Sequence, residues 1–503
     1  MKGTLSRLFL VIVSSLGGLE AASDRPQQPN VLFLWTDEQA YNTMRVYGND
    51  KIKVPHINRF SEDAVTFVRA YVTQPVCAPS RSSIMTGYWP HETEVVYNHI
   101  HLSKETKTLA ERLEGTDYVT AYMGKWHLGD ENFRQRGFDE WVSMEDGYTR
   151  FNSEGRDSSR KSDYWHWLVE KGYEPNNKNK NVFSREFAVS LPIEHCKPSF
   201  LEEKAVNFLE RHKNEPFVLY VNYLEPHMPF SGPLNDLHDI EDIELPPNYY
   251  DPVEDNEPVY AREKQRDSRK KYLLHERASR ALIQRYWGLC AQVDRSVGGI
   301  LRKLDELGLS ENTIVVYTSE HGDMMGAHQM VAKNVMYEEA VRVPLLIRIP
   351  WMDTPRSVFE EPVSLIDLMP TLLDALGLDV QEDLGGQSLL PNISSGEESD
   401  RDVFMVWHPN TRDRPDIRAR LYSGDEGIRQ PGYASNRAIV SGGWKLSLAD
   451  YDRSQLFNLR EDPYEFTNLF DDPAYRGVVE ELTKKIHVWQ ESVKDPAPPM
   501  GTY

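Results

Sequence analysis

Five short runs of apolar residues, separated by stretches with helical periodicity, restrict most strongly how this chain can fold. The runs are VLFLWT (31–36), YVTAYM (118–123), FVLYVNY (217–223), TIVVYTS (313–319) and VPLLIRI (343–349). Apolar side chains follow one another without the alternation of a strand that has one face in water, which is typical of strands buried on both faces. Helical patterns such as SFLEEKAVNFLERH (199–212) lie between the runs. The sequence therefore predicts an α/β fold, with a large mixed, mostly parallel sheet sandwiched by helices.

A polar passage near residue 395 divides the chain into two predicted units. The passage GGQSLLPNISSGEESD (385–400) follows the helical pattern SLIDLMPTLLDALGL (364–378), and strand-like runs reappear after it in RDVFMVW (401–407) and NRAIVSGGWKLSLAD (436–450). Polar, glycine-containing segments between periodic segments are typical of loops and linkers. We therefore expect one large domain over residues 24–395 and a smaller α+β subdomain over residues 396–503.

Residues 1–23 have the pattern of a secretory signal peptide, with Lys2 and Arg7 before an apolar run (8–13) and small residues at 21–23. The run is far shorter than the ~20 residues that cross a bilayer. We therefore expect an exported, periplasmic or extracellular protein with no stable membrane insertion. The net charge of −21 argues against general affinity for nucleic acid.

Charged and imidazole side chains follow four of the apolar runs, where each strand would end. They are Asp37, Glu38, Lys125, His127, His227, Glu320 and His321. Ligands of open α/β sheets bind outside the carboxyl ends of the strands. Each of these residues taken alone is more often a loop, cap or surface residue than a functional one. Their coincidence at four strand ends favours one common site.

The chemistry of these side chains indicates a cation and an anionic substrate. Asp37, Glu38 and Glu320 offer hard oxygen donors of the kind that bind Ca²⁺ or Mg²⁺. His321 is either a fourth ligand or faces a bound molecule. Lys125 and Lys333 add positive charge, so the set predicts a site that binds and cleaves an ester of a strong oxyanion.

Cys77, one of three cysteines, lies in the stretch QPVCAPSRSSIMTG (74–87). Three thiols cannot all pair within one exported chain, so at least one is left over. Pro79 near a first turn and Gly87 as a stop predict a short helix that begins close to Cys77. Residue 77 would then lie at a helix N-terminus, where free N–H groups favour an oxyanion.

The stretch CAPSR (77–81) resembles the C-x-P-S-R signature of the type I, formylglycine-dependent sulfatases of the alkaline phosphatase superfamily. Further stretches resemble blocks of that family in the same order, so the resemblance covers nearly the whole mature chain. These stretches are LFLWTDEQ, GKWHLG, EPHMPF, YTSEHGDMMGAH, YEEAVRVPLLIRIP and LFNLREDPYEFTNL. The resemblance implies an alkaline phosphatase-like fold and a sulfuric ester hydrolase whose catalytic domain spans residues 24–395.

The resemblance also implies how the site works. A maturation enzyme would oxidise Cys77 to Cα-formylglycine (3-oxoalanine), whose hydrated aldehyde attacks sulfur and later releases sulfate. Arg81 would stabilise the resulting diol, and Lys125 and Lys333 would neutralise the sulfate oxygens. His127 would be the base that collapses the sulfated intermediate, and His227 would help to protonate the leaving alcohol. One Ca²⁺ would be bound by Asp37, Glu38, Glu320, His321 and a diol oxygen of residue 77.

Glu38 and Glu320 depart from the family pattern, which commonly has Asp, Asn or Gln at the first position and Asp at the second. Each Glu is one methylene longer than Asp. We therefore expect the cation to be displaced, bidentately held or partly hydrated.

Export and the resemblance to polysaccharide-active members favour a sulfated polysaccharide or oligosaccharide as the substrate. Candidate substrate residues flank the signature or lie in the basic run 407–420, namely His91, Asn98, His99, His101, Arg412 and Arg414. Two alternatives remain. One is a phosphonate or phosphate ester hydrolase of the same superfamily, and the other is a non-catalytic glycan-binding protein whose Cys77 is never converted.

Overall fold

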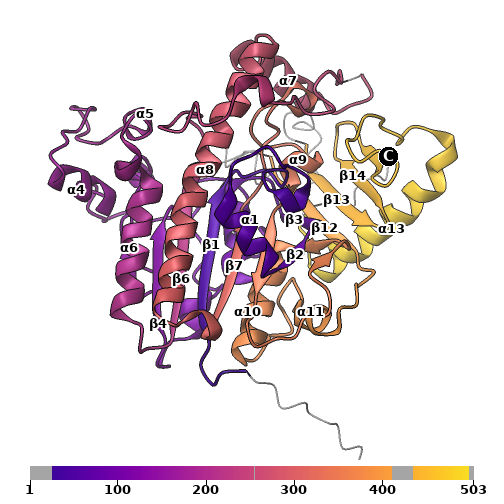
Figure 1. The fold of residues 1–503 in the computed structure, drawn as a ribbon. Coiled ribbons are helices and arrows are strands. Elements are labelled where there is room, and N and C mark those ends of the chain that lie inside the picture. The colour runs from indigo at the N-terminus through magenta and orange to yellow at the C-terminus, as the bar shows by residue number, and fades with distance from the viewer. Residues whose placement is uncertain (1–24, 254, 410–433, 498–503) are drawn as a thin grey trace, which may run out of the picture.

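The computed structural model describes residues 25–253, 255–409 and 434–497 (Figure 1). Its centre is an eight-stranded sheet in the order β10-β2-β9-β7-β1-β6-β4-β5. The strands are β1 (Asn30–Asp37), β2 (Val65–Phe67), β4 (Val119–Gly124), β5 (Glu140–Val142), β6 (Phe217–Pro226), β7 (Thr313–Ser319), β9 (Leu345–Arg348) and β10 (Val358–Phe359). β1 pairs in parallel with β6 and β7, and β9 pairs antiparallel with β7 and β2. The predicted mixed, mostly parallel sheet is confirmed.

Both faces of this sheet are covered by helices, which explains the continuous apolar runs. Phe33 and Trp35 of β1 pack in one hydrophobic cluster with residues of α2 (Cys77–Thr86) and α10 (Leu368–Leu376). Leu32 and Leu34 point to the other face and pack with residues of α1 (Pro55–Glu62), α6 (Lys197–Arg211) and α8 (Glu276–Glu306). In Figure 1, α6 and α8 lie side by side over one face of the sheet.

The remaining elements connect or flank the main sheet. A three-stranded sheet has the order β11-β3-β8, formed by β3 (Ala70–Tyr71), β8 (Arg342–Val343) and β11 (Val363–Ser364). The other helices before the C-terminal part are α3 (Leu109–Arg112), α4 (Asp163–Glu170), α5 (Arg185–Ala188), α7 (Val259–Lys271), α9 (Glu338–Val341) and α11 (Leu390–Ser395).

The C-terminal part of the chain forms a separate antiparallel sheet beside the main one (Figure 1). Its strands, in spatial and chain order, are β12 (Val403–Trp407), β13 (Asn436–Ser441), β14 (Trp444–Ala449) and β15 (Gln455–Asn458). Helix α13 (Arg476–Ser492) covers one face, where Leu482 and Ile486 pack on Ile439 and Leu446. The smaller α+β unit is therefore present, and a boundary near residue 395 stays a prediction.

Two sequence-based predictions fall on residues that the structure does not describe. The predicted signal peptide (1–23) lies outside the described residues, as do Arg412 and Arg414. Within residues 25–253, 255–409 and 434–497, none of the helices combines the length and the apolar character that a bilayer crossing needs.

Candidate active site

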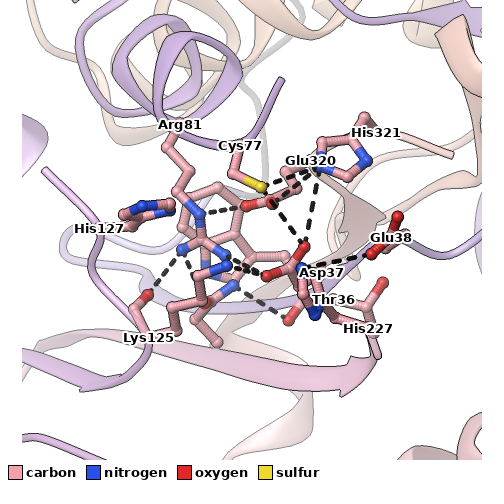
Figure 2. Close-up of polar contacts among 12 residues, drawn as sticks. Thr36, Asp37, Glu38, Cys77, Arg81, Lys125, His127, His227, Glu320 and His321 are labelled. Atoms are coloured by element: carbon pink, nitrogen blue, oxygen red, sulfur yellow. Dashed lines mark hydrogen bonds and ion pairs between the residues drawn. The ribbon is translucent and has the colours of Figure 1, made fainter. Parts of the chain in front are cut away.

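The carboxyl ends of β1, β4, β6 and β7 meet at one edge of the main sheet, as parallel pairing requires (Figure 2). Asp37 is the last residue of β1, and Glu320 directly follows β7. Lys125 and His227 directly follow β4 and β6. Glu38 has φ 72°, a left-handed conformation that turns the chain immediately after the strand. The predicted common site at four strand ends is therefore present in the fold.

Cys77 is the first residue of α2, and it faces this strand edge. Its Sγ lies 3.3 Å from Nε2 of His321 and 4.0 Å from Oδ1 of Asp37. The helix ends at Gly87, whose φ of 79° is the left-handed conformation that favours glycine at a helix end. The predicted helix start at Cys77 and its stop at Gly87 are both confirmed.

Arg81 joins α2 to three of the strand ends from a fully buried position. Its Nη1 donates to the carbonyl oxygen of Lys125 at 2.6 Å and to Oδ1 of Asn222 at 2.7 Å. Its Nε contacts the carboxylate of Glu320, and Nη2 lies 3.8 Å from Asp37. Sequence reasoning missed Asn222, although a polar residue inside an otherwise apolar strand was a signal that could have found it.

Two lysines neutralise the carboxylates that follow β1. Lys125 Nζ contacts Oδ2 of Asp37, and Lys333 Nζ lies 3.0 Å from Oε2 of Glu38. Burial raises the pKa of Asp37, but the Lys125 ammonium and its other cationic neighbours hold that pKa well below its usual value. Burial likewise opposes ionisation of Glu38, and Lys333 lowers its pKa overall. Both carboxyl groups are therefore charged at neutral pH.

The acceptors around His321 fit a bound cation. His321 Nδ1 lies 3.0 Å from the carbonyl oxygen of Gly322, which requires a proton on Nδ1 and makes Nε2 the nitrogen that faces the other acceptors. That Nε2 lies 3.1 Å from Oε1 of Glu320 and 3.8 Å from Oδ1 of Asp37, besides Cys77. Glu320 Oε1 and Glu38 Oε1 are buried and accept no hydrogen bond from the described residues.

The carboxylate oxygens that converge here create a demand for positive charge. Burial lowers the pKa of His321, but its neighbours, led by Cys77, raise it to about 10 overall, so a proton on Nε2 meets part of this demand. Asp37, Cys77, Glu320 and His321 form one group whose ligand atoms could hold a metal ion, and Asp37, Glu38 and His227 form a second. Carboxylate oxygens dominate the combined set, which suits a hard divalent cation.

His127 is held by its backbone and by a second imidazole. The backbone N–H groups of Trp126 and His127 donate to the carboxylate of Glu131 at 2.9 and 2.8 Å. His127 Nε2 lies 3.1 Å from Nδ1 of His99. Burial, followed by the Lys125 ammonium, holds the pKa of His127 well below its usual value. His127 is therefore neutral near pH 7 and able to accept a proton.

His227 has a defined tautomer and lies beside Glu38. Its Nδ1 lies 2.8 Å from the carbonyl oxygen of Met228, so Nδ1 carries the proton. Its Nε2 lies 3.4 Å from Oε2 of Glu38. Burial, followed by Lys333, lowers the pKa of His227 to about 3.

A cavity of about 760 Å³ opens beside this group of residues. Six of the predicted site residues line it, namely Cys77, Asn98, His99, His127, His227 and Lys333. Asn98 also accepts the N–H of Ala78 in the first turn of α2 at 3.0 Å. Tyr148 and Arg185 also line the cavity, and sequence reasoning missed both because no motif surrounds them.

The structure places two other predicted substrate residues away from this cavity. His91 Nε2 contacts the carbonyl oxygen of Val493, just beyond α13. His101 contacts Phe151 and Ser153 and lines a small separate pocket together with His99. These partners explain both imidazoles as supports of neighbouring loops.

Comparison with known proteins identifies the family of this chain. The Sulfatase family model matches residues 29–378. An ulvan-active sulfatase of Formosa agariphila is 27% identical over 482 residues, which cover 92% of this chain and 81% of that protein. An N-acetylglucosamine-6-O-sulfatase of Bacteroides thetaiotaomicron is 25% identical over 562 residues, which cover 99% of this chain and 93% of that protein.

The fold is similar to solved structures of the same superfamily. A phosphonate monoester hydrolase from Silicibacter pomeroyi superposes with a TM-score of 0.77 at 23% identity, over 92% of this chain and 96% of that one. At this identity the similarity shows the fold alone. The family match extends over more than half of the chain and includes the strand ends and the helix that build the site. The chain belongs to the sulfatase family of the alkaline phosphatase superfamily, and it is a sulfuric ester hydrolase.

Proposed function

We propose that this chain is an exported sulfatase that removes sulfate from a sulfated polysaccharide or oligosaccharide, by means of a formylglycine made from Cys77. One observation carries the proposal. Cys77 lies at the N-terminus of α2, 3.3 Å from His321 and at the wall of the cavity, among three cationic side chains. These cations are Arg81, Lys125 and Lys333. A cysteine that is buried only for packing lies among apolar side chains, whereas cationic neighbours are typical of a reactive position.

The glycan substrate and the export are supported by similarity and by the N-terminal sequence. The two sulfatase relatives are named for ulvan and for N-acetylglucosamine 6-O-sulfate. The N-terminal residues 1–23 carry the charge and apolar pattern of a signal peptide. We therefore retain residues 24–395 as the catalytic domain and residues 396–503 as the C-terminal subdomain.

The chain's own residues would share the work of binding and proton transfer. A divalent cation, Ca²⁺ in our proposal, held by Asp37, Glu38, Glu320 and His321, together with a hydrated formylglycine at position 77, would supply a charged nucleophilic oxygen next to the sulfur. Lys125 and Lys333 bind the sulfate oxygens and neutralise their charge. Arg81, held by Asn222 and Glu320, orients residue 77 from the same helix.

The two histidines have separate tasks. His127 is neutral and buried, so it accepts a proton from residue 77 when sulfate is released. His227 offers Nε2 to the leaving oxygen, because Nδ1 is bound to Met228. Donation requires a second proton on His227, which the negative charge of a bound sulfate ester favours.

The test combines mass spectrometry of residue 77 with an assay. The chain is expressed with and without a formylglycine-generating enzyme, and the peptide that carries residue 77 is weighed. Hydrolysis of 4-nitrophenyl sulfate should rise in proportion to the converted fraction, and Cys77→Ala should abolish it. Conversion without sulfatase activity would contradict the proposal.

A parallel assay addresses the phosphonate alternative. 4-Nitrophenyl phenylphosphonate is offered to the same converted preparation. We expect kcat/KM to be higher for the sulfate, because an aryl sulfate offers three non-bridging oxygens to Lys125, Lys333 and the cation, whereas a phenyl group replaces one of them in the phosphonate. A strong preference for the phosphonate would overturn the choice of sulfate.

A further inference from the structure

Arg185 holds its guanidinium group rigidly in the wall of the cavity beside residue 77. It is the first residue of α5, and 26% of its side chain is exposed. Its Nε and Nη2 donate to Oε2 of Glu145 at 2.9 and 2.7 Å, and Nη2 also donates to the hydroxyl of Tyr148 at 3.0 Å. Three bonds on one side of the planar group fix its orientation.

The remaining nitrogen of this guanidinium has no acceptor among the described residues. Nη1 lies 3.5 Å from Nδ1 of His227. That Nδ1 is already 2.8 Å from the carbonyl oxygen of Met228 and therefore carries a proton, so it cannot accept another hydrogen bond. Both N–H groups of Nη1 are free to bind a molecule in the cavity.

The charge of Arg185 is only partly neutralised by its neighbours. The carboxylate of Glu145 is shared between Arg185 and Lys197. Arg185 therefore receives only a share of the negative charge of Glu145.

The cavity as a whole is cationic, although the chain carries a net charge of −21. Three acidic side chains line it, against six basic ones, which are Arg150, Lys161, Lys180, Arg185, Lys197 and Lys333. A fixed guanidinium with free donors in such a cavity favours a carboxylate or a sulfate, because charge-assisted hydrogen bonds are strong and directional.

We infer that Arg185 binds a second anionic group of the substrate, a carboxylate or a second sulfate, close to the scissile ester. The inference rests on the proposed function, in which His227 serves the leaving oxygen. Because Nη1 of Arg185 lies 3.5 Å from His227, the second anion belongs to the leaving sugar and not to the sulfate that is removed. The substrate class is a sulfated sugar with a neighbouring uronate or with a second sulfate.

The first experiment compares three aryl sulfates with the converted enzyme. 4-Nitrophenyl sulfate has no second anion, 5-nitrosalicylate O-sulfate has a carboxylate beside the ester, and 4-nitrocatechol disulfate has a second sulfate there. The variants are Arg185→Met, Arg185→Lys and a control, Arg269→Met, whose side chain is exposed on α7 and does not line the cavity. Lys197 remains to pair with Glu145, so we expect Arg185→Met to fold.

The measured quantity is the ratio of kcat/KM for each dianionic ester to kcat/KM for 4-nitrophenyl sulfate. Intrinsic reactivities of the esters cancel when the ratios of two enzymes are compared. We expect Arg185→Met to lower the ratio about 10- to 100-fold, Arg185→Lys to lower it less, and Arg269→Met to leave it unchanged. The dianionic ester whose ratio falls in Arg185→Met shows whether the second anion is a carboxylate or a sulfate. An unchanged ratio in Arg185→Met overturns the inference.

The second experiment measures binding without turnover. Isothermal titration calorimetry on Cys77→Ala compares the binding of glucosamine 6-O-sulfate with that of glucosamine 2-N,6-O-disulfate. The same titrations are repeated on the double variant that carries Cys77→Ala and Arg185→Met. We expect the disulfate to bind more tightly, with that advantage lost in the double variant; an equal advantage in both proteins overturns the inference. A converted wild-type enzyme that hydrolyses no sulfate ester would instead refute the proposed function.

Discussion

The imidazole of His127 is tied to the imidazole of His99 by a contact of 3.1 Å between Nε2 and Nδ1. His99 stacks on Phe151, with ring centroids 3.7 Å apart, and His127 stacks on Tyr148 at 4.3 Å. The two imidazoles are therefore held between two aromatic rings. Nδ1 of His127 has no hydrogen-bond partner among the described residues.

Removal of the His99 imidazole should impair the base. We expect His99→Ala to lower kcat for 4-nitrophenyl sulfate about tenfold, because an unheld His127 samples unproductive orientations. His99→Asn should retain more activity, since Asn offers a polar atom near the position of Nδ1 and tolerates the φ of 65° found there.

The same variant tests the electrostatic role of His99 through the pH profile. His99 is one of the groups that lower the pKa of His127, after burial and Lys125. Its removal raises that pKa, and a base works only when unprotonated. The acid limb of kcat/KM should therefore move to higher pH in His99→Ala. An unchanged limb together with an unchanged kcat would show that His99 does not act on His127.

Removal of the cation should reduce both activity and stability. We expect dialysis against a chelator to lower the rate and the melting temperature, and Ca²⁺ to restore both. At a concentration about 100 times Kd, a ligand of the folded state adds about 2.7 kcal/mol to the free energy of unfolding. Asp37→Asn should raise at least tenfold the Ca²⁺ concentration that gives half of this response. Glu311→Gln, which changes an exposed acid outside the site, should leave that concentration unchanged. Equal Ca²⁺ responses in both variants would place the cation elsewhere.

Asn222 should matter to both folding and catalysis through Arg81. Asn222→Leu has a similar volume but removes the oxygen that accepts from Arg81 Nη1 at 2.7 Å. A buried donor without its acceptor costs about 1–3 kcal/mol, so thermal denaturation should show a lower melting temperature. We also expect a fall of about tenfold in kcat, because the guanidinium loses one of its supports. Asn222→Asp, which keeps the acceptor, serves as the comparison, and an equal loss of kcat in both variants would argue against this role.

Asp294 should make the stability of the fold depend on pH. Its Oδ1 accepts the N–H of Ile57 in the first turn of α1 at 2.7 Å, and burial raises its pKa to about 7. The pKa of Asp294 in the folded state lies above its value near 4 in the unfolded state. Below pH 4 the carboxyl group is protonated in both states and its contribution to the free energy of unfolding is complete, and this contribution is lost as the pH rises through 7. The shift of about 3 units corresponds to about 4 kcal/mol at most.

Asp294→Asn removes this titration and keeps the acceptor oxygen. Differential scanning calorimetry at pH 5 and pH 8 should therefore show the wild type losing stability relative to the variant between these values. Parallel melting temperatures at both pH values would contradict the raised pKa. The residue lies in α8 outside the cavity, so the comparison does not depend on substrate or cation.

The main sheet could be predicted from the sequence because a strand that is buried on both faces is a continuous run of apolar residues. β1 shows this directly, since Leu32 and Leu34 pack on one face and Phe33 and Trp35 on the other. The metal candidates and Lys125 could be predicted too, because parallel strands deliver the residues that follow them to one edge of the sheet. Asp37 and Glu320 meet for this reason, although 283 positions separate them in the chain.

The sequence by itself thus determined the sheet, the strand-end residues and the position of Cys77 at the start of a helix. Only the tertiary structure decided which groups orient them: His99 against His127, Asn222 against Arg81, and Arg185 in the wall of the cavity. His99 lies in a turn outside the strands and helices. Arg185 is the first residue of α5, a helix of only four residues. Their positions depend on packing between segments distant in the chain, and no local pattern of residues records that packing.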